Sequence, residues 1–280
     1  MGDDIARTTG TGLALPRLGQ GTWEMGRTPG ARRAEAAALR LGLDLGMTLI
    51  DTAEMYADGG AEEVVADAVE GRRDDVVIVS KVYPWNASRN GVAAACERSL
   101  RRLRTDRIDL YLLHWAGAHP VEDTLAAFDD LRRAGKIREG GVSNLDVHEL
   151  EAARAATHGA RAAANQILYN LTRRGPERRL LPWCHAHGVT VMAYSPLEQG
   201  RLPRDGALAE IARRHGATPE QIAIAWTLRD PRVCSIPKAA RPAHVRANAA
   251  AAEIRLSADD LATLDTAFPV PARDGPLECL

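Results

Sequence analysis

Short apolar runs rich in β-branched residues recur along the chain, and longer segments separate them. Runs such as VVIVS and IDLYLLH are almost continuously apolar, which is typical of strands covered on both faces. Strands of this kind belong to parallel sheets with helices on their faces. The pattern predicts eight strands, at Leu18–Thr22, Thr48–Asp51, Val76–Lys81, Ile108–His114, Ile137–Ser143, Ala162–Gln166, Thr190–Tyr194 and Val233–Ile236.

The segments between these runs carry the helical period. In the segment 92–103, apolar residues recur at i, i+4, i+8 and i+11, which places them on one helical face. Helices are expected at Arg32–Leu45, Val92–Leu103, Val121–Ala134 and Asp146–Thr157. A glycine can end a helix in the left-handed conformation. The glycines in such positions are Gly46, Gly71, Gly135, Gly159 and Gly188.

The alternation of strands and helices predicts parallel strands joined by right-handed crossovers. Eight such units in about 250 residues match a closed (β/α)8 TIM barrel. An open doubly wound sheet is the alternative, but its G-x-G-x-x-G fingerprint is incomplete, because Leu15 and Glu24 stand where the third glycine is needed. The Thr- and Gly-rich segment before Leu18 is expected to form a short N-terminal hairpin that caps the barrel bottom. We expect a single domain over residues 1–280.

Charge and composition narrow the function classes. A net charge of −1 gives no field that favours nucleic acid or an anionic membrane. No apolar run approaches the roughly 20 residues of a membrane span, and the N-terminus lacks a secretory-signal pattern. The four cysteines lie far apart, which is typical of reduced thiols in a cytoplasm. The run from Cys184 to His187 lacks a second pair of ligands at zinc spacing, so no metal is expected. We expect a cytoplasmic monomer that acts on a small molecule.

Polar side chains end three consecutive predicted strands. Asp51 ends the second strand, Lys81 the third and His114 the fourth, while Tyr56 follows Asp51 by five residues. Barrel enzymes place their active sites at these strand ends. Each residue alone also has a structural interpretation, as a helix cap, a solvated lysine or a buried histidine. Their joint occurrence at one structural level favours an active site.

The four side chains suit acid–base chemistry at an oxygen that gains charge, as in carbonyl reduction. A tyrosine has an ordinary pKa near 10, and a lysine cation beside it favours the phenolate and is expected to lower that pKa. A carboxylate holds the lysine charged and in place. A neutral histidine can donate a hydrogen bond that orients the substrate oxygen. The residues thus predict Tyr56 as the acid–base group.

Seven segments carry a resemblance, in order along nearly the whole chain. They are LIDTAEMYADGGAEEVV, VSKVYPWN, LYLLHW, GKIREGGVSN, NQILYN, MAYSPL and IPKAARPAHVRANAA. Together they resemble the aldo-keto reductase superfamily. TAEMYADGGAE, KVYPWNA and LLPWC are most similar to its bacterial methylglyoxal reductase branch. The resemblance implies NADPH-dependent reduction of small aldehydes and α-oxoaldehydes by a catalytic tetrad of Asp51, Tyr56, Lys81 and His114.

The resemblance also implies residues that bind the cofactor. Tyr194 should stack on the nicotinamide ring, and Lys238 should lie at the adenosine end. The full set is Gly21, Thr22, Asp51, Ser143, Asn144, Gln166, Tyr194, Ser195, Pro196, Leu197, Gln199, Ile236, Lys238, Ala239, Arg241, His244 and Asn248. Many NADPH-using members carry Ser or Thr directly after the lysine and an Arg six residues after it. Here Ala239 and His244 stand at those positions, so the 2′-phosphate would be met by Lys238 with Arg241 or His244. NADPH is favoured over NADH on this basis.

The expected substrate pocket has an aromatic wall at the barrel mouth. Its residues are Trp23, Met55, Trp85, His114 and Trp115. The loops after His114, after Leu197 and beyond Phe268 are short, so an open site suited to small substrates is expected. Two alternatives remain at this point. One is an NAD(P)-dependent sugar or alcohol dehydrogenase on the same fold, and the other is a cofactor-binding regulatory subunit with vestigial turnover.

Overall fold

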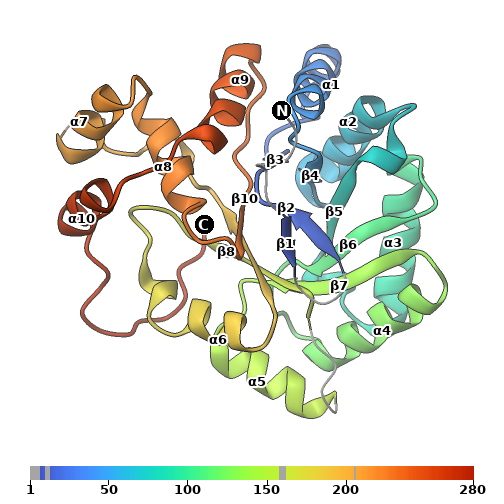
Figure 1. Ribbon diagram of the computed structural model, residues 1–280. Helices are drawn as coiled ribbons and strands as arrows, with labels where there is room; N and C mark the ends of the chain where they lie inside the picture. The colour runs from blue at the N-terminus through green and yellow to red at the C-terminus, as the bar shows by residue number, and fades with distance from the viewer. Residues whose placement is uncertain (1–6, 10–12, 158–161, 205) are drawn as a thin grey trace.

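A computed structural model of the chain describes residues 7–9, 13–157, 162–204 and 206–280. Eight parallel strands form one sheet in the order β10-β9-β8-β7-β6-β5-β4-β3. Parallel bridges between Leu18 and Ser235 and between Gly21 and Lys238 join the first strand to the last, so the sheet closes into a barrel (Figure 1). The strands are β3 (Gly19–Gly21), β4 (Leu49–Asp51), β5 (Val77–Val82), β6 (Ile108–Leu113), β7 (Ile137–Ser143), β8 (Ala164–Leu168), β9 (Thr190–Tyr194) and β10 (Val233–Ser235). The predicted TIM barrel is confirmed.

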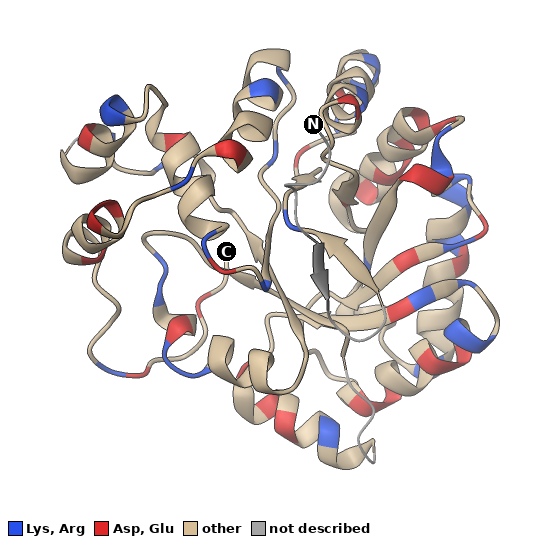
Figure 2. Cartoon of the chain, in the orientation of Figure 1, with Lys and Arg blue, Asp and Glu red and all other residues tan. Residues whose placement is uncertain are grey.

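Helices alternate with the strands and surround the barrel (Figure 1). They are α1 (Pro29–Asp44), α2 (Gly60–Val69), α3 (Arg89–Leu103), α4 (Val121–Arg133), α5 (Val147–Ala156), α6 (Leu180–Ala186), α7 (Gly206–Arg214), α8 (Pro219–Thr227), α9 (Pro242–Ala250) and α10 (Ala258–Ala267). Lys, Arg, Asp and Glu gather on these outer helices (Figure 2). None of the helices that the structure describes is long and apolar enough to cross a membrane.

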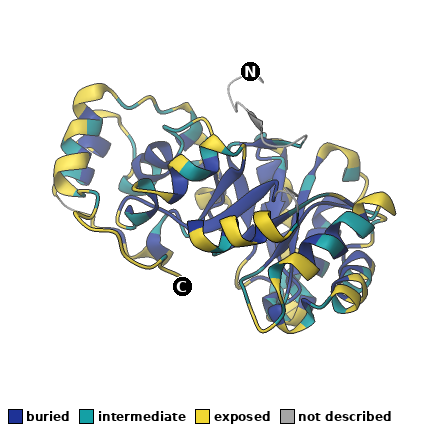
Figure 3. Ribbon diagram, turned by 90° about the horizontal axis from the view of Figure 1, so that it is seen from below, coloured by how far each residue is buried: buried dark blue, intermediate teal, exposed yellow. Residues whose placement is uncertain are grey.

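The interior of the barrel is filled by every second residue of the strands, because successive side chains point to opposite faces. Leu49 of β4, Val79 of β5 and Leu110 of β6 belong to this inner cluster. Their neighbours Ile50 and Ile78 belong to the larger cluster between strands and helices. Both layers are buried, while the outer helix faces are exposed (Figure 3). The same alternation brings Asp51 and Lys81 to the inner face.

The expected N-terminal hairpin is confirmed. β1 (Arg7–Thr9) pairs antiparallel with β2 (Ala14–Pro16). Leu15 of β2 is buried against the inner cluster that contains Leu49 and Leu110. The hairpin therefore covers the end of the barrel where the strands begin, and the opposite end stays available for a site.

Some boundaries differ from those expected. Helix α1 starts at Pro29 instead of Arg32, because proline suits the first helical turn, where its missing N–H has no partner to lose. Strand β8 runs two residues later than expected, since the alanines at its start have no strong strand preference. Of the glycines expected to end helices, Gly46, Gly71, Gly135 and Gly188 have positive φ, and Gly159 lies outside the described residues.

Candidate active site

Three neighbouring strands bring the predicted tetrad to one end of the barrel. Asp51 is the last residue of β4, Lys81 lies near the end of β5, and His114 directly follows β6. The strand register places them near the same end of the sheet, because Asp51 pairs with Val79 and Lys81 pairs with Leu112. The carboxyl ends of the strands thus assemble residues that lie far apart in the sequence.

Lys81 is the centre of the hydrogen-bond network. Its Nζ donates to both carboxylate oxygens of Asp51, at 2.9 and 2.8 Å, and to the backbone carbonyl of Thr52 at 2.8 Å. It also lies 3.3 Å from the phenolic oxygen of Tyr56. Lys81 is fully buried and Asp51 almost so. A buried ammonium needs such partners, because leaving water is costly for a charge.

Tyr56 lies on a short 3-10 turn, Tyr56–Gly59, in the loop between β4 and α2. Its ring packs against the edge of Trp23, with centroids 5.0 Å apart, and lies 5.7 Å from the ring of His114. The phenol is therefore held between a cation and an imidazole at the barrel mouth. The expected grouping of four side chains is present.

The environment sets the charge states of the site. Burial, and then the charge of Asp51, raise the pKa of Tyr56 well above its ordinary value. This direction is opposite to the one expected from Lys81 alone. The physical reason is that Asp51 neutralises the lysine charge, while burial disfavours a phenolate. Burial, and then the charge of Lys81, lower the pKa of His114 well below its ordinary value. Tyr56 is thus a neutral phenol and His114 a neutral imidazole at neutral pH.

Candidate cofactor residues lie beside the tetrad on β7, β8 and β9. Gln166 donates from Nε2 to Oδ1 of Asp51 at 2.7 Å, and the hydroxyl of Ser143 donates to the Gln166 carbonyl at 2.9 Å. The hydroxyl of Tyr194 donates to Oδ1 of Asn144 at 3.0 Å. Asn144 has a positive φ of 59°, which is uncommon for a side chain other than glycine and favours a functional site. These residues form one continuous edge next to Asp51.

The remaining candidate cofactor residues follow β3, β9 and β10. The hydroxyl of Thr22 donates to the carbonyl of Asp51 at 2.9 Å, so Thr22 borders the tetrad directly. Ser195 and Gln199 have positive φ values of 49° and 53°. Lys238 and Arg241 are exposed on the connection from β10 to α9, His244 is exposed in the first turn of α9, and Asn248 is buried in that helix. The bridge between Gly21 and Lys238 brings the connection after β10 next to β3, so Lys238 and Thr22 lie on the same side of the barrel.

The expected aromatic wall is present near the tetrad. Trp23 and Trp85 are large exposed hydrophobic residues, 42% and 69% exposed. The ring of Trp115 lies 4.9 Å from that of His114 and 6.5 Å from that of Trp85. Tyr83 contacts the rings of both Trp85 and Trp115. Met55 is partly buried and packs on the core below.

Comparison with known proteins decides the family. The model of the Aldo/keto reductase family matches residues 17–268. The chain belongs to the aldo/keto reductase family. Methylglyoxal reductase YeaE of Escherichia coli strain K12 is 52% identical over 264 residues, which cover 92% of this chain and 93% of the relative. Methylglyoxal reductase DkgB of Salmonella typhi is 32% identical over 260 residues, covering 90% and 94%.

Solved structures of the family agree with the barrel. An aldo/keto reductase from Klebsiella pneumoniae, in complex with NADP and acetate, is 49% identical with a TM-score of 0.94, covering 99% of each chain. The thermostable aldo-keto reductase Tm1743, in complex with the inhibitor epalrestat, is 42% identical with a TM-score of 0.88, covering 94% of this chain and 99% of that one. The expectation that the chain is an aldo-keto reductase is therefore confirmed, and so is its similarity to methylglyoxal reductases.

The contacts of the C-terminal segment with the candidate site could not be predicted from the sequence. The segment beyond Phe268 reaches the candidate cofactor residues, since the Leu280 N–H donates to the Tyr194 hydroxyl at 3.3 Å. The Sγ of Cys279 lies 3.5 Å from Oδ1 of Asn144. An ion pair of 2.6 Å between Arg173 and Glu278 ties the same segment to the loop after β8. The C-terminal segment thus lies against the candidate cofactor residues, and no sequence signal marks contacts between segments this distant.

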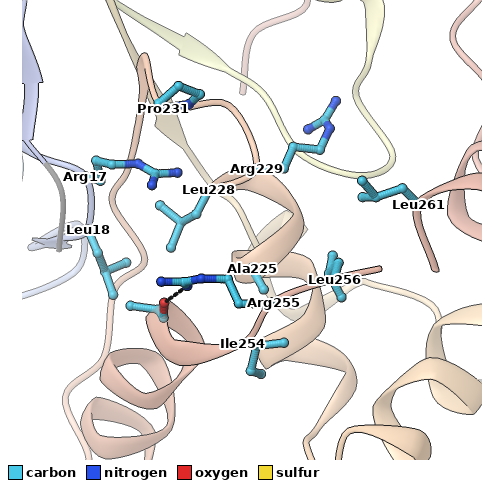
Figure 4. A pocket seen from close by; sticks show the side chains of 11 residues that line it. Arg17, Leu18, Ala225, Leu228, Arg229, Pro231, Ile254, Arg255, Leu256 and Leu261 are labelled. Carbon is cyan, nitrogen blue, oxygen red and sulfur yellow. Dashed lines mark hydrogen bonds between the residues drawn. The ribbon is translucent and has the colours of Figure 1, made fainter. Parts of the chain in front are cut away.

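A separate groove does not belong to this site. It has a volume of about 420 Å³ and includes Arg17 and Leu18 before β3 and Pro231 before β10, so it lies where the strands begin (Figure 4). The other residues that line it are Ala225, Leu228, Arg229, Ala252, Ile254, Arg255, Leu256 and Leu261. None of the tetrad contributes to it. The candidate active site lies at the opposite end of the barrel, where the strands end.

Proposed function

We propose that this chain is an NADPH-dependent reductase of small aldehydes and α-oxoaldehydes, with methylglyoxal as the first candidate substrate. The observation that carries the proposal is the buried contact of Lys81 with Asp51 and Tyr56, beside a neutral His114. The high identity to a methylglyoxal reductase supports the substrate class. All four tetrad residues come from one chain, so no partner subunit is needed to complete the tetrad, and a monomer formed as one domain is the proposed acting unit.

The residues present fit NADPH. Hydroxyl and amide groups of Ser143, Asn144 and Gln166 suit a carboxamide, and they lie next to Asp51. The ring of Tyr194 is half-buried on the same rim and suits stacking on a flat ring. At the far end, Lys238, Arg241 and His244 are exposed side chains that can carry positive charge, as a 2′-phosphate requires.

The remaining proposed contacts follow the backbone between these ends. Gly21 and Thr22 are proposed to border the nicotinamide, and a Cβ at Gly21 would lie 3.0 Å from the Ile236 carbonyl, so the packing of this rim itself requires the glycine. The residues after β9, which have positive φ at Ser195 and Gln199, are proposed to follow the pyrophosphate. Thr22, Pro196, Leu197, Ile236, Ala239 and Asn248 complete the proposed cofactor contacts. When bound, the nicotinamide supplies a hydride to the carbonyl carbon of the substrate.

The chain's own residues handle the proton and the substrate. Tyr56, kept neutral by burial, gives its phenolic proton to the substrate oxygen. His114 is neutral and orients that oxygen by a hydrogen bond. Lys81 stabilises the phenolate that remains, and Asp51 holds the ammonium in place. Trp23, Trp85 and Trp115 form the apolar wall of the proposed pocket beside Tyr56 and His114.

A screen of cofactor oxidation tests this function. Methylglyoxal, other small aldehydes, ketones and aldose sugars are each offered with NADPH and with NADH, and alcohols and sugars are offered with the oxidised cofactors. The proposal expects multiple turnovers with methylglyoxal and NADPH, and a higher kcat/KM with NADPH than with NADH. A preference for sugar or alcohol oxidation with NAD would favour a dehydrogenase instead. Cofactor binding without repeated turnover on any substrate would favour a regulatory subunit.

A further inference from the structure

The turn that carries Tyr56 is strained. The three residues after Tyr56 are Ala57, Asp58 and Gly59, and their φ values are 50°, 52° and 91°. Left-handed conformations are unfavourable for side chains other than glycine, and two such residues in succession need support from their surroundings. The position of the Tyr56 ring therefore depends on what holds this turn.

Arg102 of α3 supports the turn from outside. A Cβ on Gly59 would overlap the Arg102 side chain, so the guanidinium group packs directly on the Gly59 backbone. The Nε of Arg102 donates to Oε2 of Glu62 at 2.6 Å. Glu62 lies in the first turn of α2, three residues after Gly59, and is fully buried.

The other oxygen of Glu62 connects to the strand that carries the lysine. The hydroxyl of Ser80 donates to Oε1 of Glu62 at 2.6 Å. Ser80 directly precedes Lys81 in β5, and neighbouring strand residues point to opposite faces. Ser80 therefore faces α2 while Lys81 faces the barrel interior. One buried carboxylate thus joins the turn of Tyr56 to the strand of Lys81.

We propose that Glu62, together with Arg102, is a positioning residue that sets the phenolic oxygen of Tyr56 against Nζ of Lys81. The inference rests on the proposed function only for the acid–base role of Tyr56. A fully buried carboxylate is a costly way to fill space even when it is paired, because apolar residues of similar volume often serve stability as well or better. The Glu62–Arg102 pair instead fixes a strained turn at a defined distance from β5. The titratable groups that face the phenol are Asp51, Lys81, His114 and Tyr194.

The test compares Glu62→Gln with Glu63→Gln. Glu63 is the next residue of α2, but it is half-exposed and pairs with Arg32 at the surface, so its variant is a matched control. Positioning predicts that Glu62→Gln lowers kcat by roughly 10- to 100-fold, because a small displacement of a catalytic group is costly. NADPH binding should stay within about twofold of wild type, since no cofactor contact is changed. In the oxidation direction, the pH profile should move to higher pH, because a phenol farther from Lys81 loses a proton less readily.

Two further readouts separate positioning from general stability. Gly59→Ala displaces Arg102 from the other side and should reproduce the kinetic change of Glu62→Gln. The ring-carbon NMR resonance of Tyr56, assigned by its loss in Tyr56→Phe, should shift in both variants and not in Glu63→Gln. This resonance reports the surroundings of the phenol without catalysis, so it also tests the inference if methylglyoxal is not a substrate. An inactive wild type with these resonance shifts would overturn the proposed function and support the positioning role.

The inference is wrong if a folded Glu62→Gln protein keeps its kcat within about twofold and its pH profile unmoved. It is also wrong if the variant only lowers the unfolding temperature while the Tyr56 resonance stays in place. Should Glu62→Gln fail to fold, the same two criteria apply to Gly59→Ala.

Discussion

The side-chain amide of Gln166 donates a 2.7 Å hydrogen bond to Oδ1 of Asp51, 115 residues away in sequence. The same oxygen accepts from Lys81 at 2.9 Å. One buried carboxylate oxygen of β4 is therefore shared by a residue of β5 and a residue of β8. Because Asp51 is almost fully buried, these two hydrogen bonds replace those that the carboxylate would make with water. A change at Lys81 must consequently alter the charge balance around Tyr56 and not only the local packing.

Lys81→Met tests that balance, since it keeps much of the length and removes the cation. Without the cation the phenolate of Tyr56 is less stable, and an unpaired Asp51 charge disfavours it further. The already raised pKa of Tyr56 should rise again. Oxidation of an alcohol needs the phenolate, so its rate profile should move to higher pH in the variant.

Oxidation rates from about pH 6 to 11, for wild type and variant, check this displacement. Reduction should also slow, because a weaker acid delivers its proton less readily. A uniform loss of rate with an unmoved profile would assign Lys81 a structural role and leave the tuning of Tyr56 to other groups.

Lys238→Ala tests cofactor choice. Lys238 is exposed on the connection that follows β10, and only NADPH carries the 2′-phosphate that it is proposed to bind. Loss of a charge-assisted hydrogen bond should weaken NADPH binding about 10- to 100-fold and leave NADH binding nearly unchanged. Fluorescence titration with each cofactor measures both constants. Arg232→Ala, at the other end of β10, should change neither. Equal weakening of NADPH and NADH by Lys238→Ala would mean that the lysine supports the loop and does not recognise phosphate.

The barrel could be predicted because its signals are local. Apolar runs of strand length and helical periodicity can be recognised without knowledge of the tertiary fold. Polar residues such as Asp51, Lys81 and His114 end these runs at the same structural level. The alanine-rich start of β8 carries a weaker signal, so the sequence predicts this strand two residues too early. The family resemblance implied the candidate cofactor residues, and the structure places the amide of one of them, Gln166, against Asp51.

Contacts between distant segments could not be predicted in this way. Glu62 and Arg102 lie on different helices, and nothing in either local sequence marks their pairing. The approach of Cys279 and Leu280 to Asn144 and Tyr194 depends on the path of the whole C-terminal segment. The pKa of Tyr56 was expected to fall because Lys81 is near, but its burial could not be read from spacing. Burial and long-range pairing are properties of the assembled fold.

Asp260→Asn tests a link that lies outside the site. Burial alone would raise the pKa of Asp260, but hydrogen bonds from His215 and Ser257 outweigh it and lower the pKa from 3.8 to about 2. Asp260 also accepts from Arg214 at 2.6 Å, so it joins α7 to α10. A carboxylate whose pKa is lowered on folding stabilises the folded protein at pH values above its unfolded pKa. For Asp260 this contribution is on the order of 2 kcal/mol at neutral pH.

That stabilisation is lost as the pH falls from about 4 to 2, where the folded carboxylate takes up its proton. Urea unfolding of Asp260→Asn at neutral pH should therefore show a lower free energy of unfolding than wild type, and the difference should shrink in acid. Asp259→Asn, at the exposed neighbour, should behave as wild type. A difference that stays constant across this pH range would show that the carboxylate charge is not what stabilises this corner.

Tyr56→Phe tests the central claim most directly, because it removes only the phenolic oxygen that lies 3.3 Å from Lys81. Methylglyoxal turnover and NADPH binding are measured on the same preparation of each protein. Without a positioned proton donor, turnover should fall by about 10²- to 10⁴-fold, while NADPH binds as in wild type. A Tyr56→Phe protein that reduces methylglyoxal at close to the wild-type rate would contradict the account, since the proton would then come from another group.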